Sequence, residues 1–154
     1  MDPNNIKRIL AATDFSEVSA EAVDTAIQLA RALDATVDLV HVTPEIAIAT
    51  PPPVDFVALP LDPAAAVDEA SRKMADEERH ARERGVSCES NVLVGRPDAA
   101  IVAHADETSA DLIVIATHQR EGITHALLGS TAERVVQHAH CPVLTVPQRR
   151  QPQI

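Results

Sequence analysis

Five short aliphatic runs alternate with four segments of helical periodicity, and this alternation limits the fold more than any other feature of the sequence. The runs cover residues 8–13, 36–42, 87–94, 111–116 and 141–146. Strands separated by helical crossovers run parallel, and aliphatic parallel strands need helices on both faces of the sheet. The pattern therefore predicts an open, Rossmann-like α/β fold, with a five-stranded parallel sheet between two layers of helices.

Local signals predict where several helices begin. Ser16 stands in front of the first helical segment, and Asp62 stands in front of a charged segment at residues 64–84. Ser and Asp side chains accept hydrogen bonds from the free N–H groups of a first turn, so both are predicted N-caps. Ser130, followed three residues later by Glu133, matches a capping box and predicts the start of the last helix.

Length and composition predict a single domain. The chain has 154 residues, about the length of one domain, so residues 1–154 are predicted to form one unit with a tail at 148–154. Residues 43–63 hold six of the eleven prolines, and proline lacks the N–H that regular structure uses, so they are predicted to form a long connection. With two Phe and no Trp or Tyr, the core has to be aliphatic.

Charge and glycine content exclude several functional classes. The 23 Asp and Glu residues outnumber the 13 Lys and Arg residues, which gives a net charge of −10. A surface of that sign repels nucleic acids and anionic membranes, so neither is an expected partner. The four glycines form neither a GxGxxG dinucleotide turn nor a GxxxxGKS or GxxxxGKT phosphate loop.

The sequence also predicts a cytoplasmic protein. No apolar run approaches the length of a spanning helix, and the N-terminus has neither the basic start nor the apolar stretch of a secretory signal. Cys88 and Cys141 are too few for a disulfide framework, which fits a reducing compartment.

The expected ligand site lies at one edge of the predicted sheet. In open parallel sheets, ligands bind beyond the carboxyl ends of the strands, where the strand order reverses. The candidates are therefore the residues after the first and fourth runs, namely Thr13, Asp14 and the chain from Ala116 onward.

Five motifs follow one another along nearly the whole chain. They are ATDFS at 12–16, LVHV at 39–42, VGRP at 94–97, LLGSTAERV at 127–135 and CPVL at 141–144. In this order they resemble the motifs of the universal stress protein family. The resemblance implies a sheet with strand order 3-2-1-4-5 and a homodimer formed through the fifth strand, residues 142–146.

The resemblance also implies an ATP-type nucleotide pocket. In the nucleotide-binding branch of the family, the loop after strand four follows Gly-x2-Gly-x9-Gly-Ser. Here Ala116 and Gln119 take the first two glycine positions, and only Gly129 and Ser130 are kept, followed by Thr131. Glycine permits close backbone approach and positive φ, so Ala116 and Gln119 are predicted to narrow the pocket and weaken the binding of ATP. Mg is expected only together with ATP.

The same resemblance indicates which residues would surround the adenosine and the phosphates of a bound ATP molecule. It implies that Ala12, Thr13 and Asp14 line the adenosine end and that the backbone of Val42 meets the adenine edge. At the phosphate end, the free N–H groups of the last helix, which begins near Gly129, favour an anion. The cationic candidates beside a phosphate are the following loop residues: His118 and Arg120.

These residues leave three functions open. The leading hypothesis is a regulatory binding module that is not an enzyme. A slow Mg-ATP hydrolase would use Asp14, His118 and Ser130. A protein-interaction module would have an empty pocket.

The remaining histidines carry no predicted function. His138, His140 and Cys141 are close in sequence, but neighbouring side chains near a strand point to opposite faces, and zinc needs four converging ligands. No metal site is therefore predicted. His104 and His125 are expected to be solvated.

Overall fold

The computed structural model describes residues 5–45, 62–118 and 128–148. Within them, five strands alternate with four helices. The strands are β1 (Arg8–Ala12), β2 (Thr36–Thr43), β3 (Cys88–Val94), β4 (Leu112–Thr117) and β5 (Val143–Pro147). The helices are α1 (Glu17–Leu33), α2 (Pro63–Glu83), α3 (Pro97–Thr108) and α4 (Ser130–His138).

All strand pairs are parallel, in the order β3-β2-β1-β4-β5. This confirms the predicted fold class and the strand order that the family resemblance implied. β1 lies at the centre because its residues pair with both β2 and β4. The strand order reverses between β1 and β4, so a cleft can form where these two strands end.

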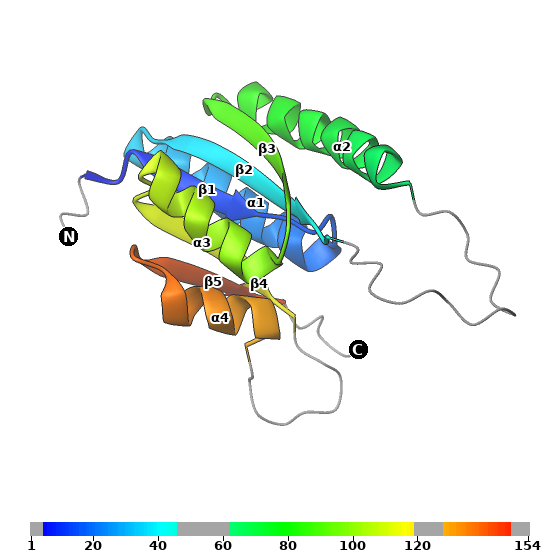
Figure 1. Cartoon of the computed structure of the whole chain (residues 1–154). Coiled ribbons are helices and arrows are strands. Elements are labelled where there is room, and N and C mark those ends of the chain that lie inside the picture. Colours follow the sequence, from blue (N-terminus) through cyan, green and yellow to red (C-terminus); the bar gives the residue numbers. More distant parts are fainter. Residues whose placement is uncertain (1–4, 46–61, 119–127, 149–154) are drawn as a thin grey trace, which may run out of the picture.

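Two helical layers enclose the sheet, with α1 and α2 on one face and α3 and α4 on the other (Figure 1). Successive residues of β1 face opposite layers: Ile9 packs with α1, whereas Leu10 packs with α3 and α4. Both layers are built from Val, Ile, Leu and Ala, with Met74 filling space under α2. The aliphatic composition therefore produces two apolar layers without a large aromatic residue at either centre.

Two of the predicted helix caps are confirmed. The Ser16 hydroxyl accepts the N–H of Ser19 at 3.2 Å and caps α1. The Asp62 carboxylate accepts the N–H of Ala64 at 3.0 Å and caps α2. Both side chains satisfy first-turn donors that have no partner inside the helix.

The capping-box prediction at Ser130 is wrong. α4 begins at Ser130 itself, Gly129 occupies the N-cap position, and no side chain caps the helix. The Gly129 carbonyl already accepts the N–H of Glu133 at 2.9 Å. The helix therefore starts one residue earlier than the box requires, and the Ser130 hydroxyl does not cap it.

The prediction that His104 is solvated is also wrong. Its side chain is 13% exposed, and Nε2 lies 2.9 Å from Oδ2 of Asp38. At the end of α4, Nδ1 of His138 donates to the carbonyl of Arg134, and His140 pairs with Asp106 on α3. His125 and residues 46–61 and 149–154 lie outside the described residues, so the predicted connection and tail are described only at their ends.

No helix among the described residues is both long and apolar enough to cross a membrane. Cys88 on β3 and Cys141 just before β5 are free thiols near opposite edges of the sheet.

Candidate functional site

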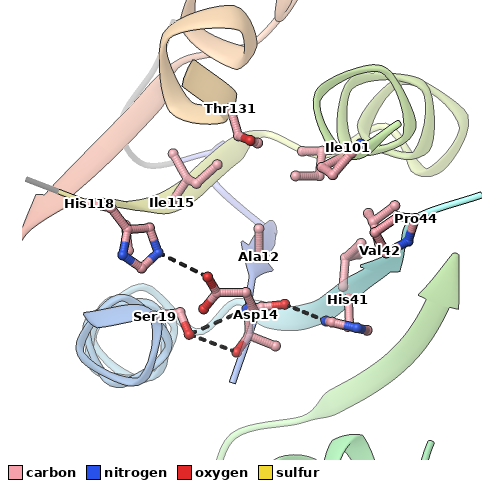
Figure 2. A pocket seen from close by; sticks show the side chains of 14 residues that line it. Ala12, Asp14, Ser19, His41, Val42, Pro44, Ile101, Ile115, His118 and Thr131 are labelled. Carbon is pink, nitrogen blue, oxygen red and sulfur yellow. Dashed lines mark hydrogen bonds and ion pairs between the residues drawn. The ribbon is translucent and has the colours of Figure 1, made fainter. Parts of the chain in front are cut away.

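A cavity of about 330 Å³ opens where β1, β2 and β4 end, between α1 and the N-terminal turns of α3 and α4 (Figure 2). Its volume lies within the range of small-molecule sites. Its walls come from six elements and the turns between them. They are Ala12, Thr13, Asp14, Ser19, Val40, His41, Val42, Pro44, Pro97, Ile101, Ile115, Ala116, His118 and Thr131.

The structure brings most of the predicted site residues to this one cavity. The predicted residues that line it are Ala12, Thr13, Asp14, Val42, Ala116, His118 and Thr131. Gly129 lies next to His118, since a Cβ at position 129 would be 3.6 Å from the His118 backbone nitrogen, but neither Gly129 nor Ser130 lines the cavity. Gln119 and Arg120 lie outside the described residues.

Half of the residues that line the cavity were not predicted from the sequence. The missed residues are Ser19, Val40, His41, Pro44, Pro97, Ile101 and Ile115. Some signals were available: Val40 and Ile115 stand near the ends of predicted strands, and Pro97 opens a predicted helix. Ser19 and Ile101 carry no such signal, because their places depend on how closely the first turns of α1 and α3 approach the sheet.

Hydroxyl groups shape the turn from β1 into α1. Thr13 continues the sheet, since its N–H donates to the Val40 carbonyl at 2.9 Å. Its hydroxyl lies 3.1 Å from that of Ser19 and accepts the N–H of Phe15 at 3.1 Å. Phe15 has a φ of 65°, an unusual value for a bulky residue. The turn is therefore held in a strained conformation beside the cavity by the side chains around it.

Asp14 and His118 join the ends of β1 and β4 across the cavity. The Nε2–H of His118 donates to Oδ2 of Asp14 at 2.9 Å, and Oδ1 accepts the N–H of Ser16 at 3.0 Å. Partial burial acts to raise the pKa of Asp14, but hydrogen bonds from Ser16 and Ser19 and the charge of His118 outweigh it and lower the pKa to about 2. Asp14 is therefore a carboxylate at neutral pH and acts as a hydrogen-bond acceptor.

His41 supports this turn from the other side of β2, away from Val42 (Figure 2). Its Nδ1 lies 2.9 Å from the Thr13 carbonyl, and because a carbonyl only accepts, Nδ1 carries the hydrogen. The His41 ring packs on Phe15 with centroids 4.4 Å apart, and the ammonium of Lys73 lies 5.1 Å from the Phe15 ring. This stack fixes the base of the turn that presents Asp14.

The cavity has two chemically different ends. One is aliphatic, with Val42, Ile101 and Pro44 together, and the other presents the Asp14 carboxylate and the His118 ring (Figure 2). Such a site suits a ligand with a flat apolar part and hydroxyl groups that can donate to a carboxylate. Among the described residues, no three His, Cys, Asp or Glu side chains form a metal site.

Comparison with known proteins shows to which protein family the chain belongs. A model of the universal stress protein family matches residues 5–147. The chain belongs to the universal stress protein family. Universal stress protein MJ0531 of Methanocaldococcus jannaschii is 37% identical to it over 149 residues, which cover 93% of this chain and 83% of that protein.

Solved structures share the fold of this universal stress protein. The structure of hypothetical protein MJ0577, from the same archaeon, matches with a TM-score of 0.74 and 25% identity, covering 95% of this chain and 99% of that one. A universal stress protein solved in complex with cAMP matches with a TM-score of 0.68 and 25% identity, covering 91% of this chain and 96% of that one.

Proposed function

We propose that this universal stress protein is a regulatory module that binds an adenine nucleotide in the cavity at the ends of β1 and β4. The observation that carries the proposal is the pairing of an aliphatic slot with a fixed carboxylate at the reversal of strand order. The related universal stress protein solved with cAMP shows that one member of the family holds an adenine nucleotide.

The residues present fit the two halves of such a ligand. The apolar wall from Val42 to Ile101 suits a purine ring, and the backbone of Val42 can meet its edge. Asp14 is ionised and accepts hydrogen bonds, so it suits the hydroxyl groups of a ribose. A phosphate would be favoured near His118 and the free N–H groups at the start of α4.

The binding of ATP is proposed to be weak. Ala116 lines the cavity where the nucleotide-binding branch of the family has glycine, and its methyl group occupies space that a bare backbone leaves open. Gln119, at the second glycine position, and Arg120, as a phosphate partner, remain predictions from the sequence. Mg would accompany ATP, held by its phosphate oxygens.

A second candidate function, slow ATP hydrolysis, is favoured by the direct contact between Asp14 and His118. The low pKa of Asp14 counts against it, because a general base works best when its pKa is near the working pH. The module is therefore proposed to bind without turnover. Hydrolysis that exceeds the buffer rate and disappears in Asp14→Ala would establish the enzyme instead.

Homodimerisation through residues 142–146 belongs to the same proposal. Among the described strands, β5 pairs with β4 alone, so its outer edge presents unpaired backbone groups, and Leu144 is 37% exposed there. Sedimentation should give a dimer that Leu144→Lys dissociates, with Val94→Lys on the opposite edge strand as the control. A monomeric wild-type protein would contradict the dimer.

The free thiols also fit the proposed cytoplasmic location.

Calorimetric titration with ATP and Mg, and separately with AMP and cAMP, tests the binding site. We expect measurable binding that Asp14→Ala weakens and that the double variant Ala116→Gly, Gln119→Gly strengthens for ATP. Val94→Ala, exposed on β3, is the control and should bind like the wild type. No heat with any of the three nucleotides would favour the interaction module with an empty pocket.

A further inference from the structure

A buried carboxylate lies in the opposite half of the sheet from the nucleotide cavity. Asp38 stands near the start of β2, and its side chain is 2% exposed. Oδ1 accepts an amide hydrogen of Asn91 at 2.9 Å, and Oδ2 lies 2.9 Å from Nε2 of His104. The guanidinium of Arg8 is more distant, at 3.9 Å, and also faces Glu89. The Asp38 carboxylate therefore accepts its two close hydrogen bonds from Asn91 on β3 and His104 on α3.

The helix that supplies His104 also forms a wall of the cavity. Pro97 and Ile101, at the start of α3, line the cavity, and His104 follows Ile101 by three residues. At 1.5 Å per residue, His104 lies about 4.5 Å along the axis from Ile101 and about 10 Å from Pro97. Residues three apart share a helix face, so Ile101 and His104 both face the sheet. Any shift of α3 at His104 is thus passed directly to the cavity wall.

Apolar packing holds α3 less firmly than it holds α1. Seven residues of α1 are buried, whereas the buried residues of α3 are Asp98, Ile101 and Ala105. Asp98 contributes a carboxylate rather than apolar surface, and it accepts two hydrogen bonds from Arg96 in the adjoining turn. Ile101 is therefore the one large apolar side chain that α3 buries fully. The contact between His104 and Asp38 adds a directional link from α3 to the sheet.

We propose that Asp38 and His104 form a positioning pair that fixes α3 on β2 and thereby sets the shape and affinity of the nucleotide cavity. When a buried carboxylate loses a hydrogen-bond donor, no water replaces that donor. A tilt or slide of α3 that breaks the hydrogen bond from His104 to Asp38 therefore costs free energy. Neither Asp38 nor His104 lines the cavity, so the pair acts through Ile101 and Pro97. The effect on affinity rests on the proposed nucleotide binding, whereas the effect on α3 does not.

Two substitutions at His104 and one matched control test the pair. His104→Leu removes the donor to Asp38, and His104→Gln keeps an N–H donor and should restore much of the contact. His140→Leu removes the exposed partner of Asp106, which lies near the C-terminal end of the same helix, and should change nothing in the cavity. Should His104→Leu fail to fold, the double variant Asp38→Leu, His104→Leu removes both buried polar groups together and avoids an unpaired carboxylate.

Hydrogen exchange of the peptide spanning residues 97–108, measured without ligand, is the primary readout. We expect exchange of this peptide to be at least about tenfold faster in His104→Leu, or in the double variant, with α1 peptides unchanged. We further expect the affinity for AMP to fall by about twofold to thirtyfold, the range seen for coupling residues remote from a ligand. His104→Gln should lie near the wild type in both.

The outcomes separate this inference from the proposed function. Unchanged exchange in α3 would overturn the positioning pair, and so would a lower Tm with an unchanged AMP affinity, which marks a merely structural role. A wild-type protein that binds no nucleotide would overturn the proposed function alone, because the exchange measurement still decides whether His104 positions α3.

Discussion

Replacing Ile113 and Ile115 by alanine, one at a time, tests whether β4 is sealed in the core at Ile113 and borders an open cavity at Ile115. Both residues belong to the same apolar layer on β4. Ile113 is fully buried and pairs in register with Leu10 on β1 and Val143 on β5. Ile115 lies two residues nearer to the carboxyl end and lines the cavity. Each substitution removes the same three carbon atoms. A difference between the two losses in free energy of unfolding therefore comes from the packing around each residue.

The expected costs follow from burial and from the space left behind. Removing three buried carbon atoms costs about 2.4 kcal/mol, at about 0.8 kcal/mol each. At Ile113 the neighbouring strands and the buried Val135 of α4 prevent the site from closing, and the new void raises the cost to about 4 kcal/mol. At Ile115 the removed atoms only enlarge an existing space, so we expect about 2.5 kcal/mol. For a domain of this size, the corresponding falls in Tm are about 8–16 °C and 5–10 °C.

Urea unfolding followed by circular dichroism measures both free energies of unfolding. Val94→Ala, at a residue that is 61% exposed on β3, serves as the control and should change stability by less than about 0.5 kcal/mol. Equal losses for Ile113→Ala and Ile115→Ala, or a larger loss at Ile115, would refute the view that β4 passes from sealed core into an open cavity.

Three further predictions concern single side chains. Ser16→Ala should lower the free energy of unfolding in urea by about 1 kcal/mol, because it removes the cap of α1, whereas Ser130→Ala should cost less than about 0.5 kcal/mol; the reverse order would restore Ser130 as a cap. Because the pKa of Asp14 is lowered to about 2 from about 3.9 in an unfolded chain, its carboxylate stabilises the fold above about pH 4, and this contribution is lost as the pH falls from about 4 to 2. Asp14→Asn should lack this part of the acid-unfolding curve, and an unchanged curve would argue against the low pKa. Burial raises the pKa of Cys88 to about 12, so mass spectrometry should find Cys88 alkylated more slowly than the half-buried Cys141 at pH 8 and at the same rate in urea; faster labelling of Cys88 in the folded protein would count against its burial.

Local sequence patterns predicted the architecture because each depends on neighbours along the chain. The run at residues 111–116 is aliphatic after Asp111, and it forms β4, buried from Leu112 to Thr117. Ser16 and Asp62 cap their helices through N–H groups only two or three residues away. The strand order came from the family resemblance, since periodicity alone does not say which strands are neighbours.

One of the two errors concerns a contact between distant parts of the chain, and the other concerns the exact residue at which a helix begins. Whether His104 is solvated depends on Asp38, 66 residues earlier, which meets it only after α3 packs on β2. A single Asp in an aliphatic run gave no sign of a partner on a helix. The capping-box pattern placed the N-cap of α4 at Ser130, one residue too late. Gly129 can serve as the N-cap, which leaves Ser130 inside the helix. The cavity wall at Ile101 depends on the same placement of α3.

The binding of an adenine nucleotide in the cavity is tested most directly by methyl NMR of protein labelled at Ile and Val, titrated with AMP. The account predicts that the methyl signals of Val42, Ile101 and Ile115 move together with one saturation curve, while that of Ile27, buried under α1 in the opposite layer, stays in place. Movement of Ile27 alone, or no movement of the three cavity methyl signals at saturating AMP, would contradict it.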